Sequence, residues 1–202
     1  PKVTRICGID TSKGWKNRIE RTEMVDLSQA KEIEGYTDYW IFPNGRIWSN
    51  KQSGRFLSQT LRNKKDDKYY RVQLSEDGVK KTGAIHILVA ETFIGPRPLG
   101  EDGKPLDVDH IDQDSLNNHV SNLRYATKGQ NQINSGLWKN NTSGYKGVTK
   151  HRAKWTARLS FNGQRIHIGS FLCKIEAAKA YDKKAYELFG EFAWLNFPED
   201  YR

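Results

Sequence analysis

Apolar and polar residues alternate along much of the first half of the chain, which is typical of short β-strands with one buried face. Residues 39–49 hold Asn44-Gly45 between two apolar stretches, and an Asn-Gly pair tolerates the positive φ that a tight turn needs. Residues 69–79 repeat the pattern, with Asp77-Gly78 as the turn. The sequence therefore predicts two hairpins, and it predicts a short helix before them at residues 28–33.

A different pattern begins at Ile85, where a mostly apolar stretch up to Phe93 predicts a short buried helix ended by Gly95-Pro96. Further along, residues 122–127 alternate like a strand and residues 128–137 have helical spacing. With a first strand that ends near His110, these segments predict the order strand, loop, strand, helix. The middle of the chain is therefore predicted to be a ββα unit.

The last third of the chain predicts a separate small domain after a polar linker at residues 138–144. Three short strands, with Asn162-Gly163 as the second turn, precede an amphipathic helix that Gly190 ends. Their predicted ranges are 147–150, 154–161, 165–171 and 175–189. The predicted fold class is α+β, a ββα core followed by a three-stranded antiparallel sheet packed on one helix. The predicted parts are an N-terminal extension (1–33), a β-rich module (34–84), the core (85–137), the linker (138–144) and a sheet-type domain (145–202).

The charge of the chain is strongly positive. It has 33 Lys and Arg against 24 Asp and Glu, a formal net charge of +9, and a sequence pI of about 9.5. Residues 138–202 hold 12 of the basic and 6 of the acidic residues, so the excess is concentrated in the predicted C-terminal domain. Such an excess favours a polyanionic partner and is no argument about the fold.

Cysteine usage and hydropathy narrow the class of protein. Cys7 and Cys173 stand far apart and form no Cys-x-x-Cys pair, which argues against a cysteine-based zinc site and a disulfide framework. We therefore expect a reducing, intracellular setting. No apolar run has the length needed to span a bilayer, and no charged-then-apolar leader precedes the predicted domains. We expect no membrane association.

The strongest chemical signal is the dipeptide Asp109-His110, with Asn122 and Asn131 twelve and twenty-one residues beyond the histidine. The Asp109 carboxylate and the Asn131 amide oxygen are hard ligands of the kind that Mg²⁺ or Mn²⁺ prefers. His110 can act as a neutral base that takes a proton from water, because histidine changes its charge close to neutral pH. This combination predicts a one-metal phosphodiesterase site and therefore a nuclease.

Residues 108–127, VDHIDQDSLNNHVSNLRYAT, resemble the catalytic core of HNH endonucleases, and the likeness extends upstream through HILVAETF. The resemblance implies a ββα-metal fold of the variant in which the last metal ligand is asparagine. It implies that Asp109 and Asn131 bind the metal and that His110 is the general base. Asn122 would complete the catalytic set by fixing the loop through backbone hydrogen bonds, which orients His110.

Other polar residues near this block keep more than one interpretation. Asp112 and Asp114 are predicted to be loop residues rather than direct metal ligands. For His86, on the predicted apolar helix, a packing or phosphate-contacting role is favoured over catalysis. His119 is predicted to be structural or solvent-facing, and Arg124 could either reach a phosphate or be a surface charge.

Residues 144–198 resemble the plant APETALA/ethylene-response-factor type of DNA-binding domain. The frame that carries the likeness is Gly-Val, Lys-Trp, Gly-x-Arg, Ile-Gly-x-Phe, Glu-Ala-Ala-x-Ala-Tyr-Asp and Leu-Asn-Phe-Pro. It implies a three-stranded sheet in the DNA major groove, backed by the helix, with arginine reading guanine and lysine holding phosphate. Its candidate DNA contacts are Lys150, Arg152, Lys154, Trp155, Arg158 and Arg165. The alternative for Trp155 is a core aromatic.

Residues 32–59 resemble a small N-terminal module that is often joined to HNH cores in phage and intron-encoded homing endonucleases. Its basic residues could follow a DNA backbone, and a solvated surface explains them equally well. The candidate contacts are Arg46 and Arg55, with Lys51, Arg62, Lys64 and Lys65 as further basic residues.

Taken together, the leading hypothesis is a homing-type, phage-encoded, site-specific endonuclease that hydrolyses double-stranded DNA with one divalent ion, Mg²⁺ or Mn²⁺. The C-terminal domain would supply affinity and site choice, and the ββα unit would cut. We expect a monomer in the cytoplasm of a bacterial host, without a small-molecule cofactor. The alternatives are a DNA-binding regulator whose HNH unit is a vestigial scaffold and, third, an RNA-directed nuclease or RNA binder.

Overall fold

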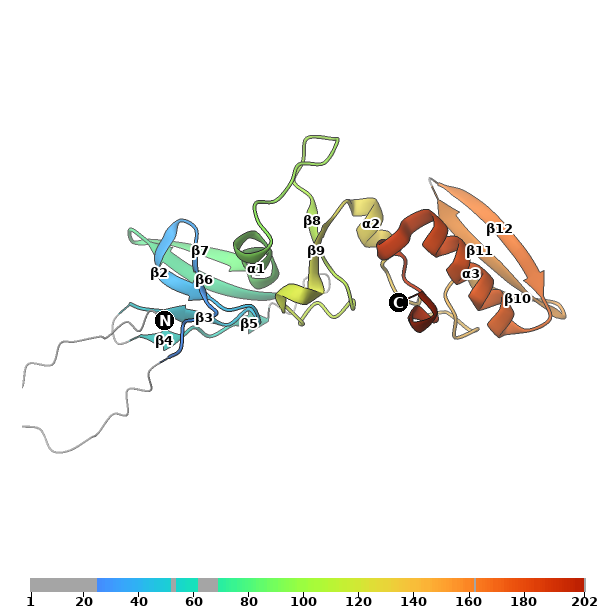
Figure 1. Ribbon diagram of the computed structural model, residues 1–202, viewed down its shortest axis with the longest axis horizontal. Helices are drawn as coiled ribbons and strands as arrows, with labels where there is room; N and C mark the ends of the chain where they lie inside the picture. The colour runs from blue at the N-terminus through green and yellow to red at the C-terminus, as the bar shows by residue number, and fades with distance from the viewer. Residues whose placement is uncertain (1–24, 52–53, 62–68, 162, 202) are drawn as a thin grey trace, which may run out of the picture. The chain divides into compact units, whose positions relative to one another are not determined.

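The computed structural model describes residues 25–51, 54–61, 69–161 and 163–201, and it confirms the α+β class (Figure 1). The chain forms two compact units, one of residues up to Pro96 with Asn118–Ser121, the other of Arg97–Asn117 and Asn122 onward. These units do not follow the predicted boundaries, because the helix at residues 85–93 belongs to the first unit. Most of the predicted N-terminal extension, with Cys7, lies outside the described residues. Among those described, no helix is long and apolar enough to cross a bilayer.

The described residues of the first unit form two antiparallel sheets and one α-helix. The four-stranded sheet has the order β1 (Lys31–Ile33), β2 (Tyr36–Ile41), β3 (Ile47–Ser49) and β4 (Arg55–Phe56). The three-stranded sheet has the order β5 (Thr60–Leu61), β6 (Tyr70–Glu76) and β7 (Val79–Ala84). Both predicted hairpins are confirmed, since β2 pairs with β3 across Gly45 (φ 84°) and β6 pairs with β7 across Asp77-Gly78.

The predicted helix at residues 28–33 is wrong, because its second half is the edge strand β1. Lys31 pairs with Ile41 of β2, and Glu32 pairs with Trp40. Ile33 is buried, with 3% of its surface exposed. Pairing with β2 satisfies backbone groups of this segment and buries an apolar side chain, whereas an isolated short helix is only marginally stable.

Helix α1 (Ile85–Phe93) has the predicted bounds and packs through one face. Its buried residues are Ile85, His86, Val89 and Ala90. The Asn44-Gly45 turn lies against this face, and a Cβ atom at Gly45 would come within 2.8 Å of Ile85 Cγ2. Glycine is therefore needed at this turn both for its φ and for the close approach of the helix. His86 packs on Tyr69 with ring centroids 4.4 Å apart, which agrees with a packing role.

The ββα unit is present in the second unit, with shorter elements than predicted. Strand β8 (Asp107–His110) pairs antiparallel with β9 (Leu123–Ala126), which follows the 3₁₀ turn η1 (Val120–Asn122). Helix α2 (Lys128–Ile133) begins at a capping box, in which Thr127 Oγ1 accepts from Gln130 N and Thr127 N donates to Gln130 Oε1. The helix ends before residue 137, and the side chain of Asn134, at its C-terminal cap, turns to the end of β8.

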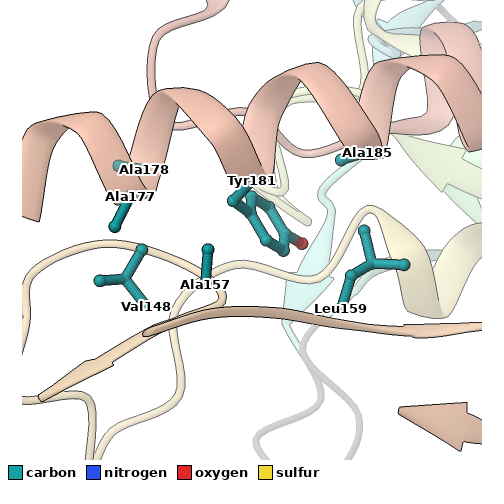
Figure 2. Packing of buried hydrophobic residues seen from close by; sticks show 7 residues of the cluster. All are labelled: Val148, Ala157, Leu159, Ala177, Ala178, Tyr181 and Ala185. Carbon is teal, nitrogen blue, oxygen red and sulfur yellow. The ribbon is translucent and has the colours of Figure 1, made fainter. Parts of the chain in front are cut away.

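The C-terminal domain has the predicted architecture. Strands β10 (Val148–His151), β11 (Lys154–Phe161) and β12 (Gln164–Phe171) form an antiparallel sheet in that order, and α3 (Lys174–Phe189) packs on it. Asn162 of the predicted turn lies outside the described residues. Figure 2 shows side chains of α3 facing those of the sheet; the cluster is Val148, Ala157, Leu159, Ala177, Ala178, Tyr181 and Ala185. The alanines let the helix approach the sheet closely, which buries Tyr181 between them.

A buried carboxylate anchors the segment after α3, which carries the 3₁₀ turns η2 (Gly190–Phe192) and η3 (Pro198–Tyr201). Asp182 has no exposed surface and accepts from Asn196 N and Nδ2 at 2.9 Å each and from Phe197 N at 2.8 Å. Burial raises the pKa of Asp182, although these hydrogen bonds act in the opposite direction. The Asp182 carboxylate therefore holds the Leu-Asn-Phe-Pro segment to the helix.

Candidate active site

The candidate site is built on the β8–β9 hairpin, where Asp109 and His110 end the first strand. Asp109 pairs directly with Arg124 of β9, and His110 pairs with Leu123. Side chains of directly opposed residues in an antiparallel pair lie on the same face, so Arg124 stands beside Asp109. Asp109 and His110 are both buried, with 3% and 6% of their surfaces exposed. The hairpin register therefore places a buried acid next to the histidine and opposite an arginine.

Two side chains bind the Asp109 carboxylate. Arg124 Nε donates to Oδ2 at 2.9 Å, and Arg124 Nη2 forms an ion pair with the same oxygen at 2.9 Å. Asn134 Nδ2 lies 3.1 Å from both carboxylate oxygens and 2.9 Å from the His110 carbonyl oxygen. The sequence left two interpretations for Arg124, a phosphate contact or a surface charge. The ion pair with buried Asp109 excludes the surface charge. A buried carboxylate requires such partners, because an unpaired charge at this depth would be strongly destabilising.

Helix α2 and its C-terminal cap hold two asparagines beside this hairpin. Asn131, the predicted metal ligand, is half-buried on α2, and Asn134 follows one turn later. Residues three apart lie on the same face of a helix, so both belong to the face that packs on β8 and β9. The structure brings Asn134 into contact with Asp109. Asn134 was not among the residues predicted from the sequence. The i, i+3 spacing from Asn131 was the only signal that could have found it.

Asn122 fastens the loop that follows His110. Its Nδ2 donates to Asp112 Oδ1 at 2.8 Å and to the Asn117 carbonyl oxygen at 2.9 Å, and its Oδ1 accepts from Asp112 N at 3.0 Å. Its backbone carbonyl also accepts from Ile111 N at 2.9 Å. Burial alone would raise the pKa of Asp112, but the hydrogen bonds from Asn117, Asn122 and the backbone, with the charge of His110, lower it. Asn122 thus holds both sides of the loop that begins at His110.

The donor set suits a hard divalent cation that is held in part by its substrate. Asp109 offers a buried carboxylate, and Asn131 offers an amide oxygen on the helix packed against it. Within the described ranges, no group of three or more His, Cys, Asp and Glu side chains could hold a metal ion. A few protein oxygens completed by water and phosphate are typical of Mg²⁺, whereas zinc sites use three or four nitrogen and sulfur ligands. The residues present therefore fit Mg²⁺ or Mn²⁺.

Two cations connect the ββα part to the C-terminal domain inside the second unit. Arg124 Nη1 donates to the Glu191 carbonyl oxygen at 2.6 Å, and its guanidinium lies 4.2 Å from the Phe192 ring centroid. Lys146 Nζ donates to the carbonyl oxygens of Ile133 and Ser135 at 2.6 and 2.5 Å, at the C-terminal end of α2. Burial lowers the pKa of Lys146 to about 8. Neither contact was predicted, because each joins residues far apart in the sequence.

The sheet of the C-terminal domain divides the predicted DNA contacts between its two faces. Ala157 is in the core and pairs with Val148, so the pair Lys150–Trp155, two residues along each strand, lies on the same helix-facing side. Trp155 indeed packs against the core cluster, as its alternative interpretation predicts. The exposed lysine, arginine and histidine residues on the opposite face are His151, Lys154, Arg158, Arg165 and His167. Arg152 is in the turn between β10 and β11.

The candidate contacts of the N-terminal module are exposed in the first unit. Arg46 follows the Asn44-Gly45 turn, and its guanidinium lies 3.7 Å from the centroid of the Phe56 ring. Arg55 begins β4. The further basic residues Arg62, Lys64 and Lys65 lie outside the described residues.

Comparison with known proteins decides the family. The family model of HNH endonucleases matches residues 84–133, which include Asp109, His110, Asn122 and Asn131. Protein 3.8 of Escherichia phage T7 is 36% identical over 110 residues, which are 54% of this chain and 86% of that protein. The chain belongs to the HNH endonuclease family.

Two further relatives match only part of this HNH chain. The uncharacterized HNH endonuclease L560 of Acanthamoeba polyphaga mimivirus is 44% identical over 90 residues, 44% of this chain and 46% of that protein. A solved structure described as DNA binding and cleavage by the HNH homing endonuclease I-HmuI is 36% identical. The match covers 52% of this chain and 56% of that chain, with a TM-score of 0.44. The HNH chain thus spans about half the length of these two relatives.

A relative of another kind is the dehydration-responsive element-binding protein 2C of Arabidopsis thaliana. It is 41% identical over 58 residues, which are 27% of the HNH chain and 17% of the plant protein. The matched length is close to that of the C-terminal domain, which carries the plant-type frame of residues.

Proposed function

We propose that this HNH chain is a metal-dependent, site-specific endonuclease that hydrolyses a phosphodiester bond in double-stranded DNA. The observation that carries the proposal is the buried Asp109 beside His110 at the end of β8, bound by Asn134 at the C-terminal cap of α2, the helix that carries Asn131. Relatives named HNH endonucleases, and one described as binding and cleaving DNA, support the same reaction class. The T7 relative supports a phage origin for the chain.

Each site residue has a distinct task in this proposal. Asp109 and Asn131 would hold one divalent ion, Mg²⁺ or Mn²⁺, which when bound neutralises charge that develops on the phosphate and the leaving oxygen. His110 takes a proton from the attacking water at an imidazole nitrogen. Asn122 keeps the loop after His110 in place, and so it holds the imidazole where the water must lie. Asn134 keeps the Asp109 carboxylate oriented through both of its oxygens.

The C-terminal domain is proposed to supply DNA affinity. Lys154, Arg158 and Arg165 share the exposed face of the sheet, and so these three residues would lie toward the major groove. Lys150 and Trp155 lie on the helix-facing side of the sheet, so they would contact DNA less directly, and Arg152 would do so from the turn between β10 and β11. Arg46 and Arg55 would add phosphate contacts from the first unit. Because phosphate contacts dominate such binding, the affinity should fall steeply as salt rises.

A plasmid assay tests the reaction. Purified protein is incubated with supercoiled DNA, with Mg²⁺ or with EDTA, beside His110→Ala. We expect metal-dependent conversion to open-circular or linear DNA, and a rate about 10²- to 10⁴-fold lower in His110→Ala, the range for loss of a general base. His119→Ala is the matched control, since His119 is an exposed histidine that bonds Ser121 and should not alter the rate.

The same assay separates the proposal from its alternative. Open-circular product would show nicking of one strand, and linear product would show cleavage of both. Salt-sensitive DNA binding without cleavage, on plasmid and on DNA of the source genome, would instead favour a DNA-binding regulator. Equal rates for His110→Ala and wild type would remove His110 from the mechanism.

A further inference from the structure

Arg124 binds a single carboxylate oxygen of Asp109. Both contacts, from Nε and from Nη2, go to Oδ2 at 2.9 Å. The pair is secluded from water, since the Arg124 side chain is 13% exposed and that of Asp109 is 4% exposed. In such surroundings charges interact much more strongly than they do at the surface. The guanidinium is thus a tightly held counter-ion of the carboxylate.

A divalent metal ion and the Arg124 guanidinium would compete for the Asp109 carboxylate, because both are cations that bind its oxygens. A bound Mg²⁺ lies about 2.0–2.1 Å from a carboxylate oxygen, closer than the two arginine nitrogens. Two cations on one buried carboxylate repel each other, so one must weaken the binding of the other. We propose that Arg124 is a built-in competitor of the divalent metal for Asp109, held in that position by the C-terminal domain. This inference rests on the metal site of the proposed function.

The anchors of Arg124 beyond Asp109 lie far along the chain. Nη1 donates to the Glu191 carbonyl oxygen at 2.6 Å, and the guanidinium lies 4.2 Å from the Phe192 ring centroid. Both residues belong to η2, directly after α3. Because the same side chain contacts Asp109 and η2, any event that displaces η2 also loosens the competitor. Metal affinity and the placement of this segment are therefore coupled, and such coupling is reciprocal.

Asn134 allows the metal to replace Arg124 at Asp109 without loss of the carboxylate's orientation. It holds both oxygens of Asp109 and the His110 carbonyl oxygen without adding a charge. When Arg124 leaves, the carboxylate keeps its orientation. A role of Arg124 in merely positioning Asp109 would predict the opposite sign, because its removal would then weaken metal binding.

The test measures Mn²⁺ binding to the full chain by electron paramagnetic resonance, without DNA. Arg124→Gln should lower the Kd at least tenfold, and Asp109→Asn in that background should abolish the added affinity. Phe192→Ala removes only the ring anchor and should lower the Kd about two- to fivefold. Arg124→Lys keeps a charge near Asp109 and should remain close to wild type. Circular dichroism confirms that each variant is folded.

Arg97→Gln is the matched control. Arg97 lies in the same unit, and its guanidinium donates from Nε and Nη2 to the Leu106 carbonyl oxygen at 3.1 and 2.7 Å. The substitution Arg97→Gln removes one positive charge, as Arg124→Gln does, but at a residue that does not bind Asp109. The Kd for Mn²⁺ should therefore not change. An Arg124→Gln protein that binds Mn²⁺ no more tightly than wild type, including the case where neither binds, overturns the competition. Plasmid cleavage by wild type tests the nuclease independently of this comparison.

Discussion

Asn122 offers the sharpest test of how the structure supports the site. The change Asn122→Ala removes three side-chain hydrogen bonds, two to Asp112 and one to the Asn117 carbonyl oxygen. The asparagine is 8% exposed, so water replaces these partners poorly. A hydrogen bond contributes about 1 kcal/mol net, and an unpaired buried group costs about 1–3 kcal/mol. We therefore expect the free energy of unfolding to fall by about 2–4 kcal/mol.

The loop after His110 should loosen as well, because both of its sides depend on this residue. Cleavage of supercoiled plasmid should fall at least tenfold in Asn122→Ala, at temperatures where the variant is folded. Unfolding in urea, followed by circular dichroism, measures the stability change. The matched control is Asn140→Ala, at an exposed position, where a surface substitution should stay within about 0.5 kcal/mol. An Asn122→Ala protein with the stability and rate of that control would refute the reasoning.

The pH dependence of the same variant provides a second check. The pKa of Asp112 is lowered in the folded protein, in part by the hydrogen bond from Asn122. A lowered carboxyl pKa stabilises the fold above the ordinary value of about 3.9, and the contribution is lost as pH falls through the lowered value. The stability difference between wild type and Asn122→Ala should therefore narrow below about pH 4. Titration by nuclear magnetic resonance should find a higher Asp112 pKa in the variant.

Two further predictions concern the second unit. The pKa of Lys146 is lowered to about 8, so between pH 8 and 10.5 the unfolded chain binds a proton that the folded chain does not, and stability rises with pH. Urea unfolding at pH 7 and 10 should show a gain of about 2 kcal/mol in wild type that Lys146→Met lacks, and equal gains would contradict this. Gly147 has φ 73°, and a Cβ atom there would lie 2.0 Å from Tyr181 Cδ2 and 2.7 Å from the Arg158 carbonyl oxygen. Gly147→Ala should destabilise the C-terminal domain by at least about 3 kcal/mol in thermal unfolding, and an unchanged Tm would show that the backbone can shift.

Much of the local structure could be predicted from the sequence, because turns and periodicity depend on neighbouring residues. The turns at Asn44-Gly45 and Asp77-Gly78, the bounds of α1 and β11, and the ββα order all agree with the structure. One mispredicted segment has a tertiary cause: β1 is a strand because β2 offers it a partner. Helix α2 is shorter than predicted, and Asn134 at its C-terminal cap bonds Asp109.

In the candidate site, too, the residue types could be predicted from the sequence, whereas their contacts depend on the tertiary structure. The sequence by itself identified Asp109, His110 and the asparagine spacing, since these residue types suit metal and proton chemistry in any fold that brings them together. Only the tertiary structure decided which residues contact them. Arg124 on the opposite strand binds Asp109, and Arg124 in turn binds the carbonyl oxygen of Glu191, 67 residues further along the chain. The tertiary structure also decided that Trp155 faces the helix while Arg158 faces outward. Pairing register and packing join residues that are distant along the chain, and no local pattern encodes those distances.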